Sequence, residues 1–123
     1  MSRFVDLSSM RDVLILDGWL SPDTYARHFA EIPSSPAVYL LMMADRATLT
    51  QAIVAYVGMS QNLAQRLSGH PVINEIESDT RSVFRWFKPT KAKNLRSVEA
   101  RYIHRFDPPW NVIGRPRGVK FHG

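Results

Sequence analysis

A tyrosine, an arginine and a histidine stand within fifteen residues in the stretch YVGMSQNLAQRLSGH, residues 56–70. The guanidinium of Arg66 suits a phosphate group, because its planar fork donates two hydrogen bonds and stays charged. The imidazole of His70 could donate to a phosphate oxygen or relay a proton. Each residue also has an ordinary alternative: Arg66 as a surface arginine covering Leu63, and His70 as a loop residue.

A glutamate stands out on the last predicted helix, residues 95–106. At 100° per residue, Glu99 projects from the middle of one apolar stripe, which consists of Leu95, Val98, Tyr102, Ile103 and Phe106. A buried, unpaired carboxylate is costly, so Glu99 must be protonated, paired with an arginine or bound to a metal. The alternative is a stripe rotated so that this glutamate reaches solvent.

The elements before the opening stretch predict a β-hairpin. Residues 37–43 and 52–57 are apolar, and the polar residues 45–51 separate them. Strands without alternation are typical of strands buried on both faces. With the turn centred near Ala47 and Thr48, Tyr39 stands directly opposite Tyr56, so the two phenols are expected to be neighbours on one face.

The other elements follow from stop and start signals. Ser60 is expected to cap a helix over residues 61–68 that ends at Gly69 and buries Leu63 and Leu67. Residues 82–88 predict a third strand, a basic loop follows to residue 93, and the sequence Asp107-Pro108-Pro109 ends the last helix. Ser21 and Pro22 predict a further helix start, and the prolines between 33 and 36 end that segment. The sequence therefore predicts an α+β fold with a small central antiparallel sheet flanked by helices.

Length and composition fit one compact domain. The chain has 123 residues, 45% of them apolar, and its net charge of +5 favours a polyanionic partner, although a merely basic soluble surface would look the same. There are no cysteines, so a metal would need oxygen or imidazole ligands. The polar start and the lack of a long apolar run predict an intracellular, cytoplasmic protein that does not enter a membrane.

Taken in order, these residues resemble a known family. Ala37-Val38-Tyr39, Tyr56-Val57-Gly58, Arg66, His70, Glu99 and Asn111 follow the order of the GIY-YIG nucleases. The spacing of four from Arg66 to His70, and of twelve from Glu99 to Asn111, resembles the restriction-endonuclease branch. The resemblance covers residues 36–112. It departs from the family at Ala37, where the name has glycine, and at Met59, where many relatives carry lysine.

The resemblance implies a DNA endonuclease that hydrolyses phosphodiester bonds with Mg²⁺ or Mn²⁺. Glu99 would hold the metal, Tyr39 would act as general base or position the water, and Tyr56 would support the same water or the phosphate. Arg66 and His70 would face the phosphate. Asn111 would orient Glu99 or bind the phosphate. These implied catalytic residues are Tyr39, Tyr56, Arg66, His70, Glu99 and Asn111.

Residues 1–35 would then be an N-terminal extension, helical and packed on the core, residues 36–112 the catalytic domain, and residues 113–123 a basic tail. Basic residues expected to bind DNA phosphates are Arg81, Arg85, Lys88, Lys91, Lys93, Arg115, Arg117 and Lys120. Double-strand cleavage would need a homodimer, whereas nicking would not. The rival interpretation is a GIY-YIG-like module without turnover that binds DNA or inhibits a protein.

Overall fold

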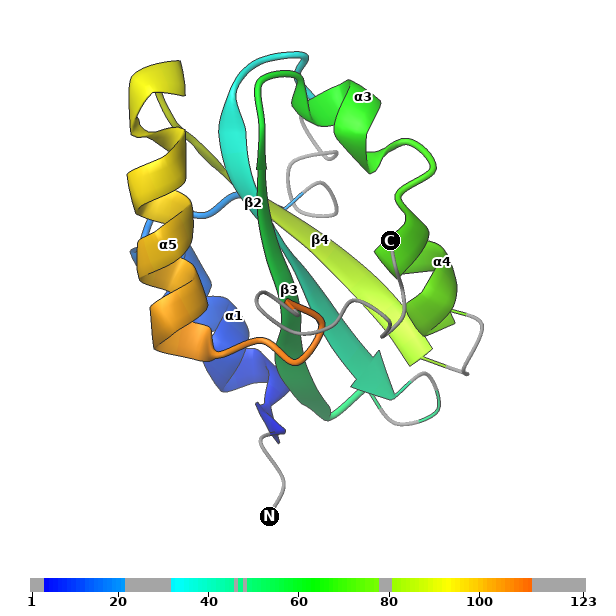
Figure 1. Cartoon of the computed structure of the whole chain (residues 1–123). Coiled ribbons are helices and arrows are strands. Elements are labelled where there is room, and N and C mark those ends of the chain that lie inside the picture. Colours follow the sequence, from blue (N-terminus) through cyan, green and yellow to red (C-terminus); the bar gives the residue numbers. More distant parts are fainter. Residues whose placement is uncertain (1–3, 22–31, 46, 48, 78–80, 112–123) are drawn as a thin grey trace.

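The computed structural model describes residues 4–21, 32–45, 47, 49–77 and 81–111, with only the backbone described at position 81. Within these residues the fold is α+β, with an antiparallel sheet in the strand order β1-β3-β2-β4 (Figure 1). The strands are β1 (Val5–Asp6), β2 (Ala37–Asp45), β3 (Gln51–Ser60) and β4 (Arg81–Pro89). The small antiparallel sheet flanked by helices that the sequence predicts is confirmed.

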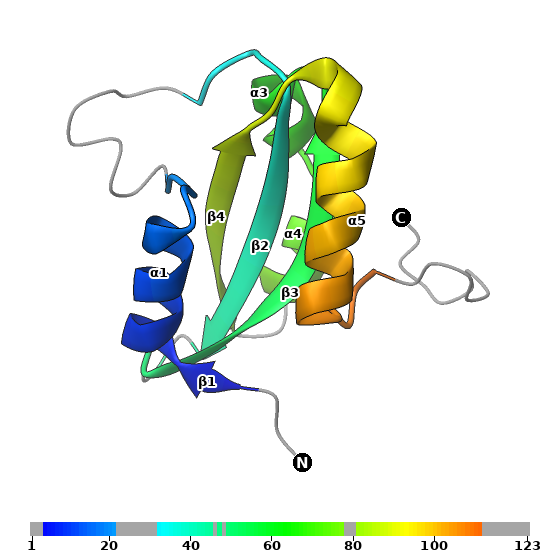
Figure 2. The same ribbon diagram turned by 90° about the vertical axis from the view of Figure 1, so that its left-hand side faces the viewer.

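Helices cover both faces of this sheet. They are α1 (Leu7–Leu16), α3 (Leu63–Leu67), α4 (Pro71–Glu77) and α5 (Leu95–Phe106), with the short 3-10 helix η1 (Ala92–Asn94) before α5. Figure 2 shows α1 and α5 on the near side of the sheet and α3 and α4 on the far side. None of the helices in the described ranges is long and apolar enough to cross a membrane.

The central strand β2 is buried on both sides, as its continuous apolar sequence predicts. Val38, Leu40 and Met42 belong to the core that α1 and α5 cover. The alternate residues Tyr39 and Leu41 belong to the core that α3 and α4 cover. The predicted phosphate residues on α3 and the glutamate on α5 therefore start from opposite faces of the sheet.

The hairpin register differs from the prediction. Tyr39 lies opposite Gly58, and Tyr56 lies opposite Leu41. The register shifts between Leu41 and Met42, because Ala55 is an extra residue in β3. Direct opposition of Tyr39 and Tyr56 is therefore wrong by two residues. Because two residues is one full period of a strand, both phenols still point to the same face, and their ring centroids are 6.1 Å apart.

The predicted helices are partly corrected. α5 has the predicted bounds, and Leu63 and Leu67 are buried as expected. The cap of α3 is Asn62, whose side chain accepts from the backbone N–H of Gln65 at 3.2 Å, whereas Ser60 ends β3 and binds Asn62 instead. α4 was not predicted from the sequence, and α1 falls within the N-terminal extension that was expected to be helical, although no helix bounds were predicted at that position. The helix expected to start at Ser21 and Pro22 falls on residues 22–31, outside the described residues.

The N-terminal segment is tied to the rest of the chain at Asp17. The Asp17 carboxylate accepts a hydrogen bond from the Tyr102 hydroxyl and pairs with Arg105 at 3.2 Å. The Lys88 ammonium donates to the backbone carbonyl of Asp17, beyond the last turn of α1. These bonds hold α1 against α5 and β4.

Candidate active site

The hydroxyl of Tyr39 is the centre of a polar cluster inside the sheet face covered by α3 and α4. It lies 2.8 Å from Nε2 of His70 and 3.1 Å from Nε of Arg66, which donates to it. Tyr56 lies beside both, with its ring centroid 5.3 Å from that of His70. The structure thus brings together four of the residues that the sequence singles out, from β2, β3, α3 and the start of α4.

Gly58 is required for this arrangement. A Cβ on residue 58 would lie 2.5 Å from both Cζ and the hydroxyl oxygen of Tyr39, so the phenol crosses directly over the glycine backbone. Because the bulge at Ala55 sets the register, it is Gly58 and not a larger residue that lies opposite Tyr39. The glycine of the YVG motif therefore makes room for the phenol of the first strand.

His70 is oriented by the start of α4. Its Nδ1 accepts a hydrogen bond from the backbone N–H of Val72 at 3.1 Å, in the manner of an N-cap side chain, with Pro71 at the first helical position. In a neutral imidazole the accepting nitrogen carries no proton, so the proton sits on Nε2. Nε2–H therefore donates to the Tyr39 oxygen. His70 is buried, and burial followed by the charge of Arg66 lowers its pKa to about 4, which keeps it neutral at physiological pH.

The Tyr39 phenol is protonated in the resting protein. Burial raises its pKa well above the ordinary value, the neighbouring Tyr56 raises it further, and the hydrogen bond from Arg66 opposes both. The phenol oxygen nevertheless accepts from two N–H donors, Arg66 Nε and His70 Nε2. Those donors would stabilise the phenolate once it forms, because they bind the charged oxygen more strongly than the neutral one.

Arg66 reaches from the phenols to an open pocket. Burial tends to lower its pKa, but its contacts with Tyr39 and Tyr56 outweigh burial and raise it, so the guanidinium stays charged. The pocket beside it has a volume of about 280 Å³ and a lining of Ser60, Asn62, Gln65, Arg66, Ser68 and Gly69. A charged guanidinium that interacts with two phenols on one side can present its remaining N–H groups to an anion in that pocket.

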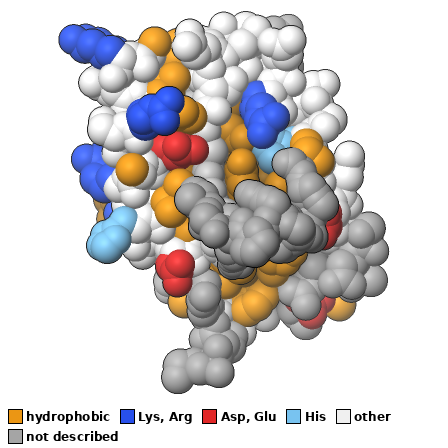
Figure 3. All heavy atoms as spheres, viewed as in Figure 1, with side chains coloured by type: hydrophobic (Ala, Val, Ile, Leu, Met, Phe, Trp, Pro, Cys, Tyr) orange, Lys and Arg blue, Asp and Glu red, His pale blue; other side chains and the backbone are white. Residues whose placement is uncertain are grey.

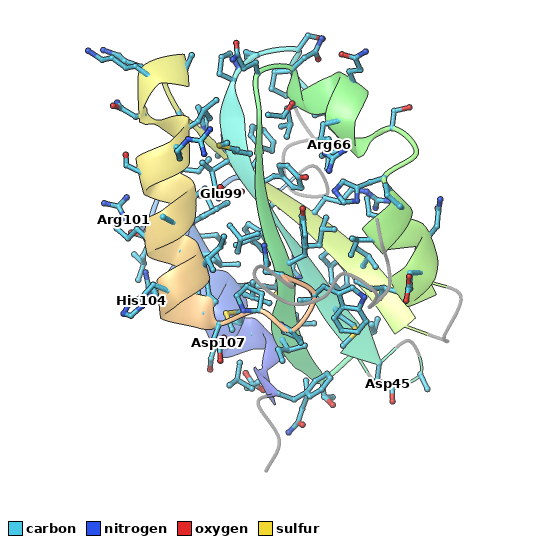
Figure 4. All side chains as sticks on the ribbon, viewed as in Figure 1. Asp45, Arg66, Glu99, Arg101, His104 and Asp107 are labelled. Carbon is cyan, nitrogen blue, oxygen red and sulfur yellow. The ribbon has the colours of Figure 1, made fainter. Side chains whose placement is uncertain are left out.

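Glu99 lies across β3 from this cluster. Figure 4 shows Glu99 projecting from α5 toward β3 and Arg66 projecting from α3, with the strand between them. Glu99 is half-buried and forms no hydrogen bond or ion pair with another described residue. Burial raises its pKa, and Arg96, one turn earlier on α5, opposes the rise. The arginine pairing considered for this carboxylate is thus not formed among the described residues.

Asn111 is bound to the backbone of β3. Its side-chain oxygen accepts from the N–H of Val57 at 2.8 Å, and its side-chain nitrogen donates to the carbonyl of Val57 at 2.7 Å. The N–H of Trp110 donates to the carbonyl of Ala55 at 2.9 Å. The segment after α5 therefore closes the free edge of β3 beside Tyr56, and within the described ranges the Asn111 side chain forms its hydrogen bonds with Val57 and none with Glu99.

The basic residues expected to bind DNA fall into three groups. Lys91 and Lys93 are exposed. Arg85 pairs with Glu77 of α4 at 3.9 Å. Lys88, opposite Val38, donates to the backbone carbonyl of Asp17 on the face of the sheet away from Tyr39. The last group lies outside the described residues or has no described side chain, and comprises Arg81, Arg115, Arg117 and Lys120.

Arg96 is a candidate that was missed from the sequence. It lines a second pocket, of about 370 Å³, together with Met59, Ser60 and Lys93. Its position three residues before Glu99 places both on one side of a helix, which is a signal that the sequence did contain. Trp86 is buried in the core, whereas Trp110 is half-buried.

A comparison of the chain with protein-family models, with curated proteins and with solved structures finds no match.

Proposed function

We propose that this protein is a divalent-metal-dependent DNA endonuclease of the GIY-YIG type. The observation that carries the proposal is the Tyr39 hydroxyl held by Arg66 at 3.1 Å and by His70 at 2.8 Å, next to Tyr56. A buried phenol that accepts from two fixed N–H donors, beside an arginine that opens onto a polar pocket, suits hydrolysis at a phosphate. A buried phenol that only packs in the core also needs a hydrogen-bond partner, so the feature that points to a phosphate is the opening of Arg66 onto the polar pocket.

In the proposed reaction the oxygen of a water bonds to phosphorus while the bond from phosphorus to the 3′ oxygen breaks, and the departing 3′ oxygen takes a proton from solvent. Tyr39, as phenolate, takes the proton of that water, or as phenol it positions the water while the proton goes to solvent. Arg66 donates to the phosphoryl oxygens, whose charge is larger in the transition state. His70 holds the Tyr39 oxygen with Nε2–H, and Tyr56 stands at the side of the same oxygen.

Glu99 is the proposed holder of the metal. If Glu99 holds Mg²⁺ or Mn²⁺, the ion would supply Lewis-acid chemistry at the phosphate. Among the described residues no group of three or more His, Cys, Asp or Glu is placed to hold a metal. A single carboxylate nevertheless fits magnesium, which keeps several waters and uses phosphate oxygens as further ligands. Glu99 fits this role because it is half-buried, its pKa is raised by burial and it has no described partner.

Relaxation of supercoiled plasmid tests the proposal. We expect nicking that requires Mg²⁺ or Mn²⁺ and that Glu99→Ala slows at least about a hundredfold. Arg101→Ala, an exposed position on the same helix, is the matched control and should nick as the unaltered chain does. Absence of metal-dependent nicking, or equal nicking by Glu99→Ala, would contradict the proposal.

The second candidate is a GIY-YIG-like module that binds DNA or inhibits a protein without turnover. Two observations favour it: the raised pKa of Tyr39, which disfavours the phenolate, and the thioether of Met59 in the lining of the second pocket. DNA binding without nicking in the same assay would select it. If double strands are cut, sedimentation with DNA should show two copies of the chain on each duplex.

A further inference from the structure

Two pockets meet at Ser60, where β3 ends. The first contains Arg66, and Ser60 also lines the second, whose other lining includes Met59, Lys93, Leu95 and Arg96. The first pocket extends along the whole of α3, and the second lies at the start of α5. Ser60 thus stands at the boundary of two adjoining hollows on the same end of the sheet.

The second pocket has an excess of positive charge. Lys93 and Arg96 are exposed, and neither forms an ion pair with another described residue. Met59 and Leu95 supply an apolar floor. Figure 3 shows Lys and Arg side chains over α5 and over α3 on the viewed face. Two cations that form no ion pair with a described residue, next to apolar side chains in the same pocket, favour an anion that also carries apolar surface.

We propose that this second pocket binds a DNA phosphate adjacent to the one that Arg66 holds, so that the strand crosses Ser60. This inference rests on the proposed function and adds the path that the DNA strand takes over the protein surface. A single small anion would occupy one pocket only, whereas a nucleic-acid strand carries anionic groups joined by sugars, which match two hollows with one shared wall. Lys93 and Arg96 would bind that phosphate without reading base sequence.

Salt dependence of DNA binding tests the subsite. The probe is a short fluorescent DNA duplex, measured by anisotropy in EDTA with a Glu99→Ala background, so that cleavage does not intervene. Arg96→Gln should reduce the slope of log affinity against log salt by about 1, and the Lys93→Gln/Arg96→Gln double variant should weaken binding at low salt at least about tenfold. Arg101→Gln, the same change one turn and a half along α5 and outside the pocket, should leave the slope unchanged.

Figure 4 shows Arg101 projecting away from the sheet, so this control removes an equal charge from the opposite side of the helix. An unchanged slope for Arg96→Gln, or the same decrease for Arg101→Gln, would overturn the subsite. Thermal denaturation of each variant shows whether it is folded.

The two proposals fail in different ways. Suppose that the unaltered chain binds duplex DNA and that Arg96→Gln reduces the slope of log affinity against log salt as expected, but that plasmid is not nicked. The subsite then stands and the endonuclease proposal falls. If it nicks plasmid while the slope of Arg96→Gln is unchanged, the endonuclease proposal stands and the subsite falls.

Discussion

The phenol of Tyr39 lies directly over the backbone of Gly58, so that a Cβ on residue 58 would stand 2.5 Å from the tyrosine Cζ. The strand that carries Tyr56 therefore also leaves the space in which Tyr39 meets Arg66 and His70. This relationship links the glycine of one strand to the chemistry proposed for the other.

Gly58→Ala should displace Tyr39, since the methyl group cannot fit beneath the ring. We expect a loss of about 1–3 kcal/mol in the free energy of unfolding and at least about a tenfold loss of nicking. For the stability measurement alone, Gly69→Ala is the comparison: its φ of +73° strains an alanine, at a cost of about 1 kcal/mol, but no atom lies within 4 Å of the new Cβ. Urea denaturation and plasmid nicking measure the two effects. If the Gly58→Ala chain were as active as the unaltered one, the close packing of Tyr39 on the Gly58 backbone would not be needed for nicking.

Tyr39→Phe removes the oxygen that Arg66 and His70 bind, and should slow nicking by about a hundredfold or more. Because burial raises the pKa of Tyr39, the phenolate fraction grows with every unit of pH above neutrality. The nicking rate of the unaltered chain should thus rise about tenfold per unit between pH 7 and 9 if Tyr39 takes the proton. Tyr102→Phe, a tyrosine that binds Asp17 on the other face, should keep rate and profile. A nicking rate that does not change with pH would indicate that Tyr39 positions the water and does not take its proton.

His70 should make folding sensitive to acid. Its pKa is lowered from 6.5 to about 4 in the folded chain, so between these values the unfolded chain binds a proton that the folded chain does not. The stability is therefore fully present above pH 6.5, falls as the pH falls and levels off below about 4, with a total loss of up to about 3 kcal/mol. Urea denaturation at several pH values should show this loss, and His70→Gln should lack it. The exposed His104→Gln should retain it.

Glu99→Gln should stabilise the metal-free chain at neutral pH. Burial raises the Glu99 pKa, so the folded state disfavours the charge that the unfolded state carries freely, and a neutral amide avoids that penalty. Millimolar Mg²⁺ should then raise the thermal midpoint of the unaltered chain but not of the variant, because a ligand stabilises the state that binds it. Equal responses of both proteins to Mg²⁺ would place the metal elsewhere.

The parts of the fold that the sequence predicts correctly depend on local signals. α5 begins and ends as expected because its apolar period is regular and Pro108 and Pro109 prevent its continuation. α4 also carried a local signal that was missed: Pro71 at the first position, then Val72, Ile73 and Ile76, all three buried. A two-residue strand such as β1 has no such signal, because it exists only where β3 offers an edge.

The hairpin register needed tertiary information. The carbonyl of the bulged residue Ala55 accepts a hydrogen bond from the N–H of Trp110, which lies in the segment after α5. No pattern within residues 37–57 indicates this bond, so a symmetric hairpin was the natural expectation. The role of Asn111 escaped prediction for the same reason, since its side chain binds the backbone of Val57, a group that every residue type shares.

The hairpin turn lies at the far end of the sheet from the tyrosines. β2 runs from Ala37 to Asp45, so its last residue is six positions from Tyr39, about 20 Å along an extended strand. Ala47 and Leu49, in the turn, are both exposed. The turn is thus an insertion point for engineering: a sequence-reading domain inserted between these residues would give the proposed endonuclease a target while leaving the positions of Tyr39, Arg66 and Glu99 unchanged.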